Sequence, residues 1–196
     1  MVYMKKLFVL LSTLFFLKAS FLHAEELKLA DFDRGQKPNL ISGDYGSWNR
    51  TEWDRSQFCN ESFTSDPRIV YNHKGCSLAL DYDVDSPNSP AYNGFWMRLE
   101  KMDLRDWKYL YFYVRGHPNF PYPDKFIVEI KNIEGKIASF LVEGITSEWK
   151  KVIIPLDKMN KEADFRQAFE FTIVFDEKIV VKRQGEIFID EFYLYR

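Results

Sequence analysis

Two adjacent acidic residues, Asp190 and Glu191, lie in the middle of the apolar segment GEIFIDEFYLY at 185–195. In a regular strand Ile189 and Phe192 would point to opposite faces, because successive side chains alternate. A β-bulge, which is one extra residue in one strand, would return both side chains to the same face. A bulge near Asp190 would direct its carboxylate to the rim of the fold, where the carboxylate has to meet a donor, water or a cation. We expect a cation.

A second set of residues combines aromatic rings with charged side chains, and these two types together suit carbohydrate. Rings supply flat apolar surface for the faces of sugar rings, and charged or amide groups hydrogen-bond the hydroxyls. The alternation directs the following residues of this kind away from the core: Trp96, Arg98, Tyr111, Tyr113, Arg115, Glu129, Lys131 and Asp176. If their strands are neighbours in one sheet, these residues form a patch on its concave face. The alternative is that the tyrosines are ordinary strand-forming residues.

Catalytic motifs are scarce in this sequence. After the first 24 residues only His73 and His117 remain, and neither lies in a metal-binding or triad pattern. The sequence has no G-x-S-x-G nucleophile elbow and no glycine-rich phosphate loop. Glycoside hydrolysis needs two carboxylates across a cleft, and the 29 acidic residues allow no choice of a pair without geometry. We therefore expect a protein that is not an enzyme.

The first 24 residues have the composition of a secretory signal peptide. Two lysines, Lys5 and Lys6, precede an apolar run at 7–17, and small residues follow before Ala24. The run is shorter than the roughly 20 residues that span a bilayer. We expect cleavage after Ala24, export to the periplasm or the medium, and no transmembrane span in the mature chain. An uncleaved anchor is the alternative, because Leu22 stands where alanine is more usual.

Length and charge set further bounds on the mature chain, residues 25–196. It is long enough for one domain with a sizeable core. Residues 1–24 contain three of the 27 basic residues and no acidic residue, so 24 basic and 29 acidic residues remain, with a net charge of −5. Nucleic-acid binders need a concentrated basic face. This charge balance therefore argues against a nucleic-acid partner.

Cys59 and Cys76 are the two cysteines of the sequence. Export would place them where disulfides persist. A bridge between them and two buried thiols are both open, because a bridge depends on a Cα separation that the sequence does not give. Two cysteines alone do not make a zinc site of the usual kind.

From Glu26 onward the dominant period of the sequence is two rather than 3.6. KYLYFYVRG, KFIVEIKN and FEFTIVFD each alternate in the way of a strand with one buried face. In the last of them the residues expected to point inward are Phe169, Phe171, Ile173 and Phe175. In total about eleven strands are predicted near 26–33, 45–53, 67–73, 76–84, 93–100, 108–116, 125–132, 136–143, 150–155, 169–176 and 186–195.

Many short strands separated by Gly, Pro, Asn and Asp clusters predict an all-β sandwich. Only 102–107 and 156–167 suit a helical turn or two, and both would connect strands. The segment GHPNFPYPD at 116–124 is too rich in proline and aromatic residues for a flexible linker, so we expect a long loop between strands. The sequence predicts a single domain over 25–196.

Several stretches resemble the galactose-binding-like jelly roll, and especially the carbohydrate-binding modules of bacterial glycan-degrading enzymes. In chain order they are LADFDRG, GCSLALDYDV, MDLRDWKYLYFYVRG, SEWKKVIIPL and GEIFIDEFYLY. The resemblance covers nearly all of the chain after residue 24. It implies a β-sandwich jelly roll of two antiparallel sheets.

The resemblance also implies a structural calcium ion between the N-terminal strand and the last strand. Asp33 in DFDRG and Asp190 in FIDEF occupy the matching places. Calcium takes six to eight oxygen ligands, so backbone carbonyls or Asp31 would have to complete the site. The alternative is a pair of solvated carboxylates at strand ends.

Three functions follow in order of preference. The first is an exported, non-catalytic module that binds a glycan through the aromatic concave face. The second is an envelope protein that contacts another protein, as the complex I intermediate-associated family, which has this architecture, does in assembly. The third is a small glycan-cleaving enzyme. The expected partner is therefore a glycan or an envelope protein.

Overall fold

The computed structural model describes residues 25–196, so the predicted signal peptide at 1–24 lies outside it. The strands are β1 (Glu26–Ala30), β2 (Tyr45–Asn49), β3 (Phe58–Thr64), β4 (Ser77–Asp83), β5 (Tyr92–Met102), β6 (Tyr109–Gly116), β7 (Lys125–Asn132), β8 (Ile137–Glu143), β9 (Lys150–Pro155), β10 (Asn160–Lys161), β11 (Ala168–Asp176) and β12 (Gln184–Tyr195). Three short 3-10 helices lie between them: η1 (Tyr71–His73), η2 (Leu156–Lys158) and η3 (Phe165–Gln167). Within the described part of the chain, no helix is long and apolar enough to cross a membrane.

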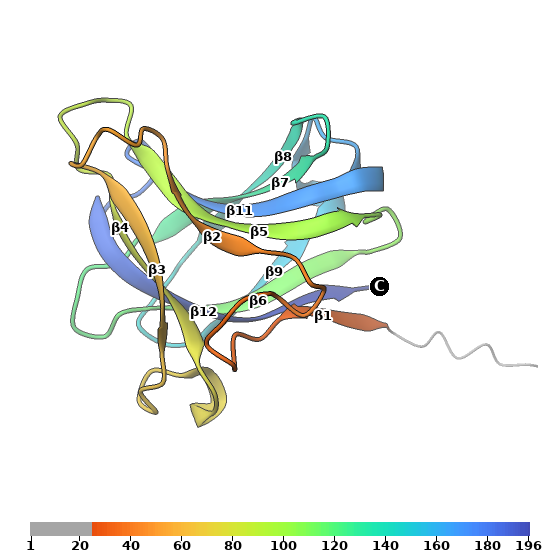
Figure 1. Ribbon diagram of the computed structural model, residues 1–196, viewed down its shortest axis with the longest axis horizontal. Coiled ribbons are helices and arrows are strands. Elements are labelled where there is room, and N and C mark those ends of the chain that lie inside the picture. The colour runs from red at the N-terminus through yellow and green to blue at the C-terminus, as the bar shows by residue number, and fades with distance from the viewer. Residues whose placement is uncertain (1–24) are drawn as a thin grey trace, which may run out of the picture.

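The strands form two antiparallel sheets that face each other (Figure 1). The first sheet has the order β3-β4-β12-β6-β9, and β1 pairs with the last part of β12. The second sheet has the order β10-β8-β7-β11-β5-β2. The predicted all-β sandwich with two antiparallel sheets is confirmed.

The core lies between the two sheets and follows the predicted alternation. Phe95 and Met97 of β5 and Phe126 of β7 are fully buried. Phe192 of β12, in the first sheet, contacts Phe171 of β11, in the second sheet, edge to face, with ring centroids 5.1 Å apart. Stacked and edge-to-face rings add to the free energy that burial of their area contributes. The large aromatic side chains therefore join the two sheets.

The bulge predicted near Asp190 is confirmed. The register between β12 and β6 shifts between Asp190 and Tyr193. Glu191 has a φ of 56°, in the left-handed region. Because of the extra residue, Ile189 before the bulge and Phe192 after it both point into the core and are fully buried.

Some predicted elements are wrong. Residues 67–73 form no strand, because Tyr71–His73 makes a 3-10 turn in which Asn72 has a φ of 53°. The strand β3 at 58–64 was missed, because its sequence FCNESFT shows no clear apolar alternation and the strand is held by its pairing with β4. Segment 102–107 contains a turn rather than a helix. Segment 156–167 contains two 3-10 helices, as expected.

Of the two alternatives left open for the cysteines, the structure has the free thiols: Cys59 is buried, Cys76 is partly exposed, and they form no disulfide. Cys59 pairs with Tyr82 at one end of the β3–β4 hairpin, whereas Cys76 precedes Ser77, which pairs with Thr64 at the other end. Six residues of strand separate the two ends, a span of about 20 Å. A disulfide needs Cα atoms within about 7 Å. The two thiols therefore lie too far apart to bond in this fold.

Reduction is expected to leave the stability of this protein unchanged. No covalent bond between Cys59 and Cys76 constrains the unfolded chain, so a reductant has nothing to break. The measurement is the melting temperature with and without dithiothreitol, together with a thiol count in denaturant. Two free thiols per chain and equal melting temperatures are expected. A lower melting temperature in reductant would contradict the two-thiol structure.

Candidate functional site

The outer face of the second sheet gathers aromatic and charged side chains in three rows that run across the strands. The first row is Trp48, Gly94, Val174, Ile127 and Leu141; the second is Gly46, Trp96, Thr172, Glu129 and Ser139; the third is Arg98, Glu170, Lys131 and Ile137. Strands β5 and β11 bow toward the first sheet at their middles, so this outer face is concave (Figure 1). We call these three rows the sheet face.

Two tryptophans lie at the edge of the sheet face, each packed against a glycine of the neighbouring strand. Trp96 of β5 is opposite Gly46 of β2, and Trp48 of β2 is opposite Gly94 of β5. A Cβ atom on Gly46 would lie 3.3–3.4 Å from three ring atoms of Trp96, so the face of the ring covers the glycine. A Cβ atom on Gly94 would lie 3.3 Å from Nε1 of Trp48. The two glycines make room for two half-buried aromatic platforms.

Trp48 lies on the sheet face, although the predicted patch did not include it. A signal was present in the segment YGSWN. Tyr45 is an inward residue that is 1% exposed, and Trp48 has the opposite parity. Alternation alone would therefore have placed Trp48 on the outer face.

Four charged side chains form a network beside the tryptophans. Arg98 donates from Nη1 to Oε2 of Glu170 at 2.7 Å, and Lys131 donates from Nζ to Oε1 of Glu170 at 3.3 Å. Lys131 also lies 3.9 Å from Oε2 of Glu129. The guanidinium of Arg98 lies 4.9 Å from the centroid of the Trp96 ring. Two cations and two anions balance, so the network is locally neutral.

Glu129 keeps hydrogen-bonding capacity in the middle of the sheet face. Thr172 donates to its Oε2 at a long 3.5 Å. Burial, the largest cause, raises the pKa of Glu129, and nearby Glu170 adds to the rise, whereas Lys131 and the Thr172 hydroxyl lower it. A half-buried carboxylate with weak partners is well placed to accept hydrogen bonds from ligand hydroxyls.

Phe169 lies on the sheet face and not in the core, contrary to the prediction. The register of β11 shifts between Ala168 and Glu170. Ala168 is therefore the buried residue, and the guanidinium of Arg98 lies 4.2 Å from the centroid of the Phe169 ring. A simple period of two hides such a bulge, because phenylalanine fits the inward pattern better than alanine does.

Tyr111, Tyr113 and Arg115 do not join the sheet face, so the prediction of one common patch is wrong. All three belong to β6, which lies in the first sheet. Their side chains point to the opposite outer surface of the sandwich. The rings of Tyr111 and Tyr193 stack with centroids 4.9 Å apart, and the ring centroids of Tyr113 and Tyr71 are 4.1 Å apart. Arg115 is only 8% exposed.

Trp96 and Arg98 of β5 and Glu129 of β7 do lie on one face of the second sheet, on either side of β11. Asp176 lies at the end of β11, opposite Tyr92. Its side chain accepts a hydrogen bond from the backbone N–H of Lys178 at 2.8 Å. The carboxylate of Asp176 is therefore engaged in the turn that ends the strand.

The two carboxylates predicted to bind calcium belong to a separate acidic site near the bulge. Asp190 is 2% exposed and accepts hydrogen bonds from the Ser77 hydroxyl at 2.6 Å and the Glu191 N–H at 2.8 Å. The pKa of Asp190 is raised to about 7: burial is the largest cause, the charges of Glu191 and Asp33 add to the rise, and the two hydrogen bonds oppose it. This carboxylate has no cationic side chain bonded to it among the described residues.

Asp33 approaches the same place from the loop after β1. A Cβ atom on Gly75, whose φ is 63°, would lie 2.0 Å from Oδ1 of Asp33. Burial, then Asp31 and Glu191, raise the pKa of Asp33, whereas Lys28 and Lys74 lower it. Across residues 25–196 no group of three or more His, Cys, Asp or Glu side chains is arranged to hold a metal ion. Any cation here would need carbonyl oxygens besides the carboxylates.

No protein-family model matches the chain, and no curated protein sequence matches it. Among solved structures it is similar to the family 11 carbohydrate-binding module of the cellulosomal cellulase Lic26A-Cel5E of Clostridium thermocellum, with a TM-score of 0.61 and 16% identity over 87% of this chain and 94% of that one. A family 11 module from Clostridium thermocellum in complex with a β-1,3-1,4-mixed-linked tetrasaccharide matches with a TM-score of 0.61 and 15% identity over 86% and 94% of the two chains.

A family 30 carbohydrate-binding module matches with a TM-score of 0.57 and 15% identity over 87% of this chain and 98% of that one. At identities this low, the structural similarity shows the fold alone. The chain therefore has the β-sandwich jelly-roll fold of these carbohydrate-binding modules, as the sequence resemblance predicted.

Proposed function

We propose that this protein binds a glycan non-covalently on the sheet face. The observation that carries the proposal is the pair of tryptophans, Trp48 and Trp96, packed against the glycines of neighbouring strands. Flat aromatic surface suits the apolar faces of sugar rings, and an exposed apolar surface of this kind usually has a partner. Similar structures with this fold are carbohydrate-binding modules, one of them in complex with a tetrasaccharide.

The charged network supplies the polar half of the proposed site. The hydrogen-bond donors are Arg98 and Lys131, and the acceptors are Glu129 and Glu170. All four side chains lie on the sheet face, no more than two rows from either tryptophan. The ion pairs between them hold the side chains in place before a ligand arrives. Such preorganisation lowers the entropy lost on binding. Since the network is neutral, we propose a glycan without a high charge.

We also propose that binding is not followed by cleavage. Glu129 and Glu170 lie on adjacent strands of one face, and both contact the same lysine, Lys131. Glycoside hydrolysis needs two carboxylates on opposite sides of the scissile bond. Two carboxylates side by side on a sheet do not provide that arrangement.

The test of the function is binding of the purified protein to a glycan array that includes mixed-linked β-glucan fragments, with calcium present. Binding to a defined glycan is expected. Absence of binding across the array would overturn the proposal and favour a protein partner in the cell envelope, to be sought by cross-linking. Release of reducing ends from a bound polysaccharide would contradict the non-catalytic assignment.

We further propose that the protein works outside the cytoplasm, as the composition of residues 1–24 predicts. Mass spectrometry of the protein recovered from the periplasm or medium is expected to show an N-terminus at Glu25. Recovery of the intact 196-residue chain from the cytoplasm alone would contradict export.

We propose that Asp33 and Asp190 contribute to a structural calcium site. The support is electrostatic: Asp190 is buried, and both Asp33 and Glu191 act on it as further negative charges. A divalent cation would offset this repulsion, and carboxylate and carbonyl oxygens are its preferred ligands. With calcium bound, Asp33 and Asp190 would tie the loop after β1 to the last strand.

Calcium is therefore expected to raise the melting temperature. At a calcium concentration 100-fold above Kd, binding to the folded state alone stabilises by about 2.7 kcal/mol, or about 8 °C for a chain of this length. The measurement is thermal unfolding with calcium and with excess EGTA. Asp190→Asn should remove the difference, whereas Asp85→Asn, at a solvent-exposed carboxylate, should retain it. Equal melting temperatures of the unaltered protein in calcium and in EGTA would contradict the site.

A further inference from the structure

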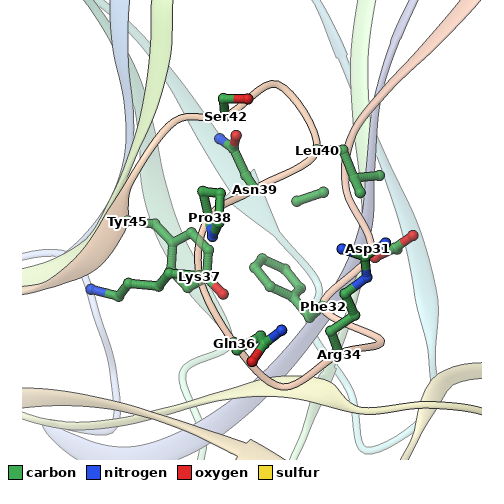
Figure 2. Close-up of a pocket in the computed structure, with 11 residues that line it drawn as sticks. Asp31, Phe32, Arg34, Gln36, Lys37, Pro38, Asn39, Leu40, Ser42 and Tyr45 are labelled. Carbon is green, nitrogen blue, oxygen red and sulfur yellow. The ribbon is translucent and has the colours of Figure 1, made fainter.

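The loop between β1 and β2 encloses a cavity that the sheet face does not use. The cavity has a volume of about 340 Å³. Figure 2 shows the chain from Asp31 to Tyr45 curving around it, with the Phe32 ring at its centre. Phe32, Pro38 and Leu40 supply apolar surface. A volume of this size lies at the lower end of the range for small-molecule pockets.

A buried hydroxyl without a partner lies in this cavity. Tyr45 is 1% exposed, and its hydroxyl has no hydrogen-bond partner among the described residues. The Tyr45 hydroxyl points toward the centre of the cavity beside Phe32, and the Gln36 amide points there from the other side (Figure 2). Leaving a buried hydroxyl without a hydrogen bond costs free energy. A polar group that entered the cavity and reached this hydroxyl would remove that cost.

Further polar groups on the rim are also unengaged. Within residues 25–196, the side chains of Arg34, Gln36 and Ser42 make no hydrogen bond and no ion pair, although all three line the cavity. By contrast, the Asn39 side chain is engaged by the fold, because it donates to the Arg98 carbonyl at 3.0 Å and accepts from two backbone N–H groups. The rim therefore offers donors and acceptors that the fold does not need.

We propose that this cavity is a second binding site, which takes a single hydroxylated ring of monosaccharide size. The apolar surface of Phe32 and Leu40 suits the face of such a ring, and the unengaged polar groups suit its hydroxyls. The charged residues that line the cavity are Asp31, Arg34 and Lys37, and Lys37 pairs with Asp44 at 3.4 Å, so Asp31 and Arg34 balance and we propose a neutral ring.

The second site is separate from the sheet face but close to it. Lys37, on the cavity wall, has its Nζ 5.5 Å from the Tyr45 ring and 6.0 Å from the Trp96 ring. Tyr45 points inward from β2, whereas Trp96 lies on the outer face of the same sheet. A variant at Trp96 therefore alters the sheet face without removing a residue that lines the cavity.

The test is titration of the full chain with D-glucose, D-galactose and D-glucuronate, followed by NMR chemical shifts. At least one sugar is expected to shift the resonances of the loop at 31–45. Tyr45→Phe should weaken that binding about ten-fold, the loss of one hydrogen bond to a buried group, without lowering the melting temperature. Arg34→Ala should weaken the binding as well, and Trp96→Ala should not.

Two results would overturn the second site. One is the absence of loop shifts with all three sugars. The other is binding that Trp96→Ala abolishes but Tyr45→Phe and Arg34→Ala leave unchanged, which would assign the sugar to the sheet face. The proposed glycan function is tested independently of this cavity. Its test is polysaccharide binding by the unaltered chain and by the Trp96→Ala variant.

Discussion

Replacing Trp96 with alanine is expected to weaken glycan binding about 100-fold, equivalent to about 2.7 kcal/mol. Trp96 is half-buried, its ring covers Gly46, and Arg98 lies 4.9 Å from its centroid. A tryptophan in such a setting is the type of residue that carries most of the energy of an interface. Its removal leaves a bare glycine beneath the ligand and deletes the apolar surface on which a sugar ring would stack.

The measurement is isothermal titration of Trp96→Ala with the glycan that the array identifies. Tyr109→Ala is the matched control, because Tyr109 is an aromatic residue of the first sheet that is 37% exposed on the opposite side of the sandwich. The control should bind as the unaltered protein does. Equal affinities of Trp96→Ala and the unaltered protein, with both folded by circular dichroism, would place the glycan elsewhere.

Replacing Gly94 with alanine is expected to destabilise the fold by about 3 kcal/mol. A Cβ atom at this position would lie 1.8 Å from the carbonyl oxygen of Ile173, which belongs to the backbone of β11. Glycine in a strand often marks such a close approach. The backbone of β5 or β11 would have to move at the centre of the second sheet, and the Trp48 ring above Gly94 would move with it.

Thermal unfolding of Gly94→Ala tests this prediction, and a fall in melting temperature of about 9 °C is expected. Gly135→Ala is the control, because a Cβ atom there meets nothing within 4 Å. Its φ of 76° should still cost about 1 kcal/mol. A melting temperature of Gly94→Ala that is no lower than that of the control would contradict the close approach.

Much of the fold was predictable because side-chain alternation is a local property. The inward residues Phe95, Met97 and Phe126 could be read from a period of two, and all three are fully buried. The bulge in β12 was also predictable, because the apolar parity changes between Ile189 and Phe192. The bulge in β11 was not, since Ala168 and Phe169 are both apolar and parity alone favours the larger one.

The candidate site was predicted only in part. Trp96, Arg98 and Glu129 were assigned to one surface and do share it, whereas Tyr111 and Tyr113 were assigned to the same surface and lie across the sandwich. All of these residues show the same alternation. Alternation predicts that a side chain points outward, but it does not predict to which of the two sheets the strand belongs.

The sequence by itself determined the all-β class, the strands with clear alternation, the identity of most core residues and the resemblance to carbohydrate-binding modules. Each of these depends on neighbours along the chain, which the sequence lists directly. The tertiary structure decided which strands pair, that Trp48 lies beside Trp96, that the two cysteines are far apart, and that the loop at 31–45 encloses a cavity. Strand pairing joins backbone groups that are nearly the same in every residue, so the choice of partner depends on how the whole chain packs and not on any local pattern.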